Sequence, residues 1–226
     1  MKPIASSLFH RVLEPRSPAG DCHPGLILLH GRGADEEDLA GLVDEFDGRF
    51  LILSPRAPYS FSFGGGFTWY EFDAVGTPDP VMFGTSYDKL FRFLRDAVAG
   101  YPIDPTRLYL FGFSMGTVMS HAIALTEPAM VRGIIANSGY VPERTPLQFR
   151  WDALGHMDVL ITHGTMDPVL PIQMGRRSQE LYRVSAARLT YREYPMGHQI
   201  SRESLDDIAV WLRTSLDSLP PPERHG

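Results

Sequence analysis

Short runs of consecutive apolar residues recur along the chain, separated by Gly, Pro and polar segments. Runs of this length without polar alternation are typical of strands covered on both faces, as in a parallel sheet. A further run, 189–194, alternates between apolar and polar residues and is expected nearer the edge of that sheet. The predicted interior strands are 25–29, 50–53, 108–113, 133–136 and 159–162.

The segments between several of these runs carry apolar residues at helical spacing. Ser204, followed three residues later by Asp207, is interpreted as a variant capping box at the start of one helix. Strands that alternate with helices predict an α/β fold with right-handed crossovers, whose sites gather beyond the carboxyl ends of the strands. The predicted helices are 87–99, ended by Gly100 and Pro102, 115–126, ended by Pro128, and 204–216.

The length of 226 residues is that of one domain large enough to hold together without disulfides or a structural metal. We expect a single domain over 1–218 and a flexible Pro-rich tail over 219–226. The 21 basic and 27 acidic residues give a net charge of −6, which argues against a nucleic-acid partner.

Cys22 is the single cysteine, which excludes an intrachain disulfide and a multi-cysteine zinc site. The first fifteen residues lack the continuous apolar region of a signal peptide. No apolar run approaches the roughly 18 residues that a spanning helix needs. We therefore expect a cytoplasmic protein without stable membrane insertion. A homodimer with two-fold symmetry, the commonest oligomer, is the reference expectation for its assembly.

Ser114 is the central residue of a G-x-S-x-G sequence that directly follows the predicted strand 108–113. A serine on a sharp strand-to-helix turn needs small residues two positions away on each side, because larger side chains would collide with the strand and the helix. The alternative is a serine that caps an ordinary helix. A strand before Ser114 and a helix after it favour a nucleophile.

A serine hydroxyl needs a base to attack at neutral pH, and in this strand–turn–helix setting the acid and the histidine follow the serine in that order. Asp167 follows the predicted strand 159–162, and His198 follows the strand 189–194. The competing carboxylates Asp104 and Asp158 precede strands instead of following them. We therefore predict Ser114 as nucleophile, His198 as base, and Asp167 as the acid that orients the imidazole. The alternatives are a turn role for Asp167 and a surface position for His198.

Other histidines fit the base less well. His30 and His163 follow predicted strands but stand in His-Gly turns, where stabilisation of the turn is the expected role. Acyl transfer also needs donors for the developing oxyanion. The backbone N–H of Met115 is one candidate, and that of Arg32, between two glycines after the strand 25–29, is the second.

Five ordered motifs together resemble the phospholipase/carboxylesterase family, the small α/β-hydrolase group that includes acyl-protein thioesterases. The resemblance covers about residues 24 to 215. It implies an α/β-hydrolase fold: a mostly parallel central sheet with helices on both faces, in a minimal single domain without a large cap. The motifs are His30-Gly-Arg-Gly33, 68–72, 104–116, 163–168 and Gly197-His198.

The resemblance also implies a Ser114–His198–Asp167 triad, with Arg32 and Met115 at the oxyanion hole. This chain departs from the family pattern at three positions that each affect the shape of the acyl pocket. Relatives usually carry Leu at the position of Arg32, Gln at Met115 and Gly at Thr117. The Arg32 side chain is expected either to be exposed to solvent or to attract an anionic acid portion of the substrate.

Aromatic residues surround three glycines between 59 and 72, and such a loop is able to form an apolar wall over the serine. We predict that Trp69, together with Phe67 and Val169, contacts the substrate. The alternative is that the aromatic residues of the loop anchor it in the core.

No cofactor or metal is implied. The acidic run 35–38 is expected in the first turn of a helix, where the helix dipole favours negative charge, and no metal-binding spacing accompanies it. Taken together, the sequence predicts a serine carboxylesterase that hydrolyses small to medium carboxylic esters through an acyl-enzyme. The alternatives are an acyl-protein thioesterase or lysophospholipase, and a non-catalytic binding module with a hydrolase-like fold.

Overall fold

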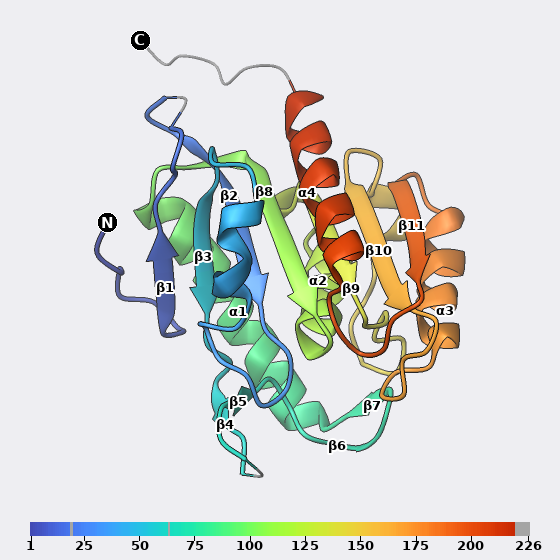
Figure 1. Ribbon diagram of the computed structural model, residues 1–226. Helices are drawn as coiled ribbons and strands as arrows, with labels where there is room; N and C mark the ends of the chain where they lie inside the picture. The colour runs from blue at the N-terminus through green and yellow to red at the C-terminus, as the bar shows by residue number, and fades with distance from the viewer. Residues whose placement is uncertain (19, 63, 220–226) are drawn as a thin grey trace.

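The continuous apolar runs form the interior of a seven-stranded sheet in the computed structural model, which describes residues 1–18, 20–62 and 64–219 (Figure 1). Neighbouring strands are parallel except at one edge, where the first strand pairs antiparallel with its neighbour. In spatial order the strands are β1 (His10–Leu13), β3 (Leu51–Pro55), β2 (His23–Leu29), β8 (Ile103–Phe113), β9 (Gly133–Asn137), β10 (Asp158–Gly164) and β11 (Arg188–Tyr194).

Strands β2, β3, β9 and β10 are buried along their whole length, as predicted for runs without polar alternation. Strand β11, whose residues alternate, lies at the edge as expected. Strand β1 was not predicted. It has only four residues, and the exposed Arg11 interrupts the apolar pattern, so its pairing with β3 is fixed by the tertiary structure.

Helices cover both faces of the sheet, which confirms the α/β-hydrolase fold (Figure 1). The larger core cluster includes residues of α1 (Pro80–Gly100), α2 (Met115–Thr126) and α3 (Ile172–Arg183). The smaller cluster lies on the opposite face, under α4 (Arg202–Asp217) and the 3-10 helix η1 (Leu39–Glu45). Two further 3-10 helices are η2 (Pro128–Met130) and η3 (Trp151–Ala153).

The predicted ends of two helices need correction. Helix α1 begins at Pro80, earlier than predicted, because the Asp79 side chain accepts a hydrogen bond from Met82 N at 2.8 Å. Helix α4 begins at Arg202 and is capped by Ser201, whose hydroxyl accepts from Ser204 N at 3.2 Å, so the predicted cap at Ser204 is wrong.

The acidic run also differs from its predicted position in the first turn of a helix. Asp38 only precedes η1, which is a 3-10 helix, and Glu36 is buried in an ion pair with Arg56 at 2.5 Å. The run therefore supplies carboxylates that pair with arginines of other segments, Glu36 with Arg56 and Glu37 with Arg11, instead of opening a long helix.

Short hairpin pieces extend from the end of the sheet where the parallel strands finish (Figure 1). They are β4 (Tyr59–Ser60) paired with β5 (Phe67–Thr68), and β6 (Phe72–Ala74) paired with β7 (Thr77–Pro78). No described helix is long and apolar enough to cross a bilayer. Of the predicted tail, 219–226, all but Leu219 lies outside the described residues.

Candidate active site

Ser114 lies on the sharp turn that joins β8 to α2. Its backbone has φ 54° and ψ −116°, a conformation that residues other than glycine seldom adopt. The Ser114 N–H donates to Asn137 O at 3.0 Å, which ties the turn to the end of β9. The strained turn lifts the serine hydroxyl above the sheet, at the amino end of α2.

The two glycines of the G-x-S-x-G sequence are required by close backbone contacts. A Cβ at Gly112 would overlap the backbone of Gly116, and a Cβ at Gly116 would overlap the carbonyl oxygen of Leu29. Helix α2 therefore starts directly against β2 and β8. This close approach is the physical reason for small residues on both sides of Ser114.

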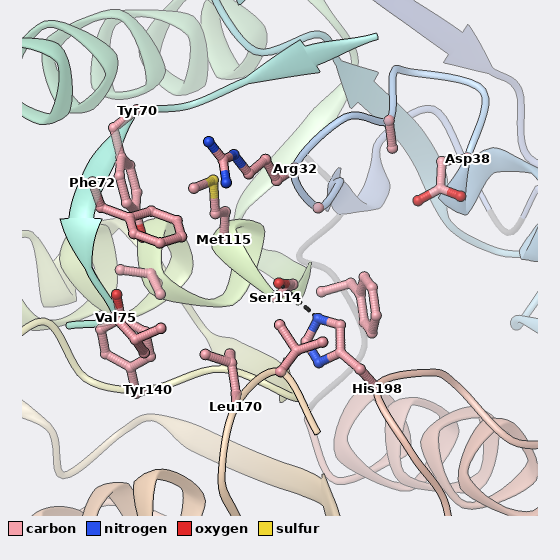
Figure 2. Close-up of a pocket in the computed structure, with 15 residues that line it drawn as sticks. Arg32, Asp38, Tyr70, Phe72, Val75, Ser114, Met115, Tyr140, Leu170 and His198 are labelled. Atoms are coloured by element: carbon pink, nitrogen blue, oxygen red, sulfur yellow. Dashed lines mark hydrogen bonds between the residues drawn. The ribbon is translucent and has the colours of Figure 1, made fainter. Parts of the chain in front are cut away.

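Three side chains, from the ends of β8, β10 and β11, meet at this turn, and Figure 2 shows two of them, Ser114 and His198. His198 Nε2 lies 2.9 Å from Ser114 Oγ, and His198 Nδ1 lies 2.7 Å from Asp167 Oδ2. The loops after β10 and β11 thus bring the acid and the histidine to the hydroxyl. With the proton on Nδ1, His198 donates to Asp167 and has its Nε2 lone pair free to accept the proton of Ser114.

Asp167 is held in its ionised form by several donors. Its Oδ1 accepts from the backbone N–H groups of Val169 and Leu170, both at 2.8 Å. Burial by itself raises the pKa of the Asp167 carboxyl, but the bonds from Leu170, His198 and Val169 outweigh it and hold the pKa below its ordinary value. An ionised Asp167 is the partner that a protonated His198 needs.

His163 supports the loop that carries this acid. Its ring is buried, and Nε2 lies 2.8 Å from Leu170 O, which identifies Nε2 as the protonated nitrogen. Burial lowers the pKa of His163, against smaller opposing effects of the bond to Leu170 and the charge of Asp167. His163 is therefore neutral and structural, as its His-Gly turn indicated.

His30 has a comparable structural role at the end of β2. Its Nδ1 lies 2.7 Å from Gly31 O, and its Nε2 accepts from Ala57 N at 3.0 Å. Burial lowers the pKa of His30, with smaller opposing effects from the hydrogen bond to Gly31 and from nearby acidic residues. The competing carboxylate Asp158 lies at the start of β10, the opposite end of that strand from the loop of Asp167, paired with Arg132 at 2.9 Å.

Arg32 and Met115 line the same cavity as Ser114. Met115 is the first residue of α2, so its N–H has no acceptor within the helix. The N–H of Arg32 donates to no described residue. Gly33 has φ +77°, which lets the chain turn directly after Arg32. Two backbone donors next to the serine are the arrangement that an oxyanion requires.

A cavity of about 360 Å³ opens above Ser114 and His198. Its wall on one side of the serine is largely apolar, and Figure 2 shows Tyr70, Phe72, Val75 and Tyr140 grouped there. Val169, which the sequence analysis proposed as a substrate contact, and Leu170 also line it. The cavity suits an apolar acyl group held beside the nucleophile.

Two of the predicted substrate contacts, Trp69 and Phe67, are not among the described residues that line the cavity. Trp69 is fully buried, and its Nε1 donates to His30 O at 3.0 Å, so the indole anchors the loop in the core. Phe67 exchanges backbone hydrogen bonds with Gly33 and Ala34, both at 2.8 Å. These two residues hold the 59–72 loop against the segment that carries Arg32.

The residues that do form the wall were not predicted individually. Tyr70 is adjacent to Trp69 in the aromatic loop, whereas Tyr140 and Val118 come from segments without a distinctive motif. The aromatic content of the loop was the available signal, but the choice between neighbouring rings depends on which way each side chain points.

Arg32 is exposed, which agrees with the first of the two expectations, and its side chain is also paired within the protein. Its guanidinium forms an ion pair with Glu71 and lies over the rings of Phe61 and Phe72, at 4.6 and 4.8 Å from their centroids. Its charge is thus compensated within the protein. Among the described residues, no group of three or more His, Cys, Asp or Glu side chains could hold a metal ion.

The chain is similar to known proteins over most of its length. The family model described as Phospholipase/Carboxylesterase matches residues 10–216. Among curated proteins, the chain is 27% identical to acyl-protein thioesterase 1 of Gibberella zeae, over 88% of this chain and 94% of the relative.

Solved structures give the same picture of the fold. A carboxylesterase from Bacillus cereus superposes with a TM-score of 0.81 at 23% identity, covering 92% of this chain and 94% of that one. The esterase PE8 superposes with a TM-score of 0.75 at 26% identity, covering 92% of this chain and 98% of that one.

Proposed function

Because the chain belongs to the phospholipase/carboxylesterase family, whose members hydrolyse ester bonds, we propose that it is a serine carboxylesterase acting on small to medium carboxylic esters through an acyl-enzyme. The observation that carries the proposal is a continuous chain of contacts: His198 Nε2 lies 2.9 Å from Ser114 Oγ, and His198 Nδ1 lies 2.7 Å from Asp167 Oδ2. Ser114 and His198 stand in the wall of the cavity.

The first half-reaction is acylation of the serine. As Ser114 Oγ attacks the ester carbonyl, His198 Nε2 takes its proton, and the positive charge on the ring is balanced by ionised Asp167. The carbonyl oxygen becomes negative and accepts from the N–H groups of Arg32 and Met115. Each such donor contributes on the order of 3 kcal/mol to stabilising the transition state. The imidazolium then gives its proton to the departing alcohol.

The second half-reaction releases the acid. A water molecule takes the position of the alcohol, His198 removes its proton, and the resulting hydroxide attacks the acyl-serine carbonyl. The same two N–H groups stabilise the second oxyanion. His198 then protonates Ser114 Oγ as the acid leaves.

The test is pre-steady-state hydrolysis of p-nitrophenyl butyrate. An acyl-enzyme predicts a burst of p-nitrophenol close to one equivalent per enzyme when deacylation limits turnover. Ser114→Ala should abolish the burst and lower kcat by at least about 10⁴-fold. Ser60→Ala, at an exposed serine of β4, is the matched control and should keep both. A folded Ser114→Ala protein with wild-type turnover would refute the proposal.

A second candidate, acyl-protein thioesterase, has a specific observation in its favour. The curated relative from Gibberella zeae, which matches 88% of this chain, carries that name. The same residues would perform both reactions, since only the leaving atom differs. The two activities are separated by comparing kcat/KM for ethyl butyrate with kcat/KM for S-ethyl thiobutyrate. Hydroxide hydrolysis of the same two compounds gives the uncatalysed preference. A preference of the enzyme for the thioester that exceeds this uncatalysed preference would favour the thioesterase.

A binding module without turnover is the remaining alternative. The aligned hydrogen bonds among Ser114, His198 and Asp167 support catalysis instead. Absence of both the burst and steady-state hydrolysis across esters of two to eight acyl carbons would favour the binding module.

A further inference from the structure

The cavity has two chemically different ends. Tyr70, Phe72, Val75 and Tyr140 form the apolar end on one side of Ser114, and Asp38 lies on the opposite side (Figure 2). The Phe113 ring lies on the same side as His198, since the two ring centroids are 5.0 Å apart. Phe113 also borders Gly31, and Asp38 comes later in the same loop after β2. We call Gly31, Asp38 and Phe113 the leaving-group end.

The reaction assigns the two ends to the two parts of an ester. In the proposed mechanism His198 Nε2 protonates the departing oxygen, so the alcohol portion leaves on the histidine side. The acyl group remains attached to Ser114 and lies on the apolar side. A substrate that fits both ends would therefore bring its alcohol portion toward Phe113 and Asp38.

Asp38 is a carboxylate without a compensating cation. Its side chain forms no ion pair or hydrogen bond with any described residue. The arginines closest along the acidic run are already engaged, since Arg56 pairs with Glu36 and Arg11 with Glu37. Asp38 is exposed at the rim of the cavity. Partial loss of surrounding water raises the pKa of its carboxyl, with a smaller opposing effect of His30 and a smaller supporting effect of Asp35.

The remaining charged side chain of the cavity does not offset Asp38. Arg32 is paired with Glu71 and lies over two aromatic rings. The charge that His198 acquires during the reaction is balanced by Asp167 at 2.7 Å. The leaving-group end therefore contributes an uncompensated carboxylate and an aromatic ring to the lining of one cavity, and these are the two kinds of group that attract ammonium ions.

We propose that the leaving-group end selects esters whose alcohol portion carries an alkylammonium group, with Asp38 as the specificity-determining carboxylate and Phe113 as the aromatic contact. This inference rests on the proposed esterase function and deepens it by naming the class of alcohol. At a partly solvated site, one such charge pair is expected to raise kcat/KM about three- to tenfold.

A matched pair of substrates tests the inference. Butyrylcholine and 3,3-dimethylbutyl butyrate have the same acyl group and the same shape, and differ in a quaternary nitrogen against a carbon. Release of butyric acid is followed with a pH-stat. The quantity compared is kcat/KM for butyrylcholine divided by kcat/KM for 3,3-dimethylbutyl butyrate. This ratio is divided by the ratio of the rates at which hydroxide hydrolyses the same two esters. The result should be about three to ten in the wild-type enzyme and close to one in Asp38→Asn.

Asp35→Asn is the control, because it removes the same charge from the same loop at a residue that does not line the cavity, and it should keep the wild-type ratio. If Asp38→Asn does not fold, the wild-type ratio in about 1 M salt serves instead and should fall toward one, since the screening length is then about 3 Å. A wild-type ratio of one or less, or an unchanged ratio in Asp38→Asn, would overturn the inference. Hydrolysis of neither ester would refute the esterase function itself.

Discussion

Replacing Asp167 by Asn should stop catalysis by changing the tautomer of His198. In the structure Asp167 Oδ1 accepts from the N–H groups of Val169 and Leu170, both at 2.8 Å, and Oδ2 faces His198 Nδ1 at 2.7 Å. The carbonyl oxygen of an Asn side chain must keep the Oδ1 position, because two backbone donors point at it. The NH2 group then faces His198, which must accept at Nδ1 and carry its proton on Nε2.

A proton on Nε2 removes the lone pair that accepts from Ser114. The same change of tautomer in serine proteases costs about 10⁴ in kcat, equivalent to about 5.5 kcal/mol of transition-state stabilisation. We expect a loss of this size for Asp167→Asn. The fold should persist, because the Asn oxygen continues to satisfy the two backbone donors.

The assay is steady-state hydrolysis of p-nitrophenyl butyrate, with thermal unfolding measured on the same samples. Asp167→Ala is the comparison variant: it leaves both backbone donors without their acceptor, which costs about 1–3 kcal/mol for each donor left unsatisfied. It should therefore lose both activity and stability, whereas Asp167→Asn loses mainly activity. A folded Asp167→Asn enzyme within tenfold of wild-type kcat would show that Asp167 does not set the tautomer of His198.

Two further predictions concern the stability of the fold. Burial lowers the pKa of His121 to about 3. Below the unfolded-state pKa of about 6.5 the unfolded protein therefore binds more protons than the folded one, and the free energy of unfolding decreases as the pH is lowered. Between pH 7 and pH 5 this histidine should account for about 2 kcal/mol of lost stability, and urea unfolding of His121→Gln should show a loss smaller by that amount; equal losses in both proteins would contradict the assigned burial. Gly116→Ala should destabilise by at least about 3 kcal/mol, because its Cβ overlaps the Leu29 carbonyl, whereas Gly84→Ala, in open space on helix α1, should stabilise by about 0.5–1 kcal/mol. Similar melting temperatures for the two variants would show that the turn has room for a methyl group.

The interior of the fold could be predicted because one physical pattern controls it. A strand covered on both faces must be apolar throughout, and β2, β3, β9 and β10 are short enough for that run to be distinctive. The elements that were not predicted lack such a pattern. Helix α3 begins with Ile172 but contains four charged residues among twelve, so its formation depends on packing against β10 and β11.

The approach of Ser114, Asp167 and His198 could be anticipated because each follows the end of a strand, directly or within a short loop, and parallel strands end at one edge of the sheet. The residues that form the cavity wall could not be anticipated in this way. Trp69 and Tyr70 are neighbours in an irregular loop, and it is the tertiary structure, through core packing and the hydrogen bond from the Trp69 indole to His30 O, that turns the larger ring inward. The ion pair of Arg32 with Glu71 joins residues 39 positions apart.

In the proposed mechanism Ser114 becomes covalently acylated, with His198 as its base. The most direct measurement is labelling of the intact protein with a fluorophosphonate, followed by mass spectrometry of its peptides. We expect one phosphonate, on Ser114, and no labelling in a folded His198→Ala variant. Modification of a different serine, or undiminished labelling of Ser114 without His198, would contradict this mechanism.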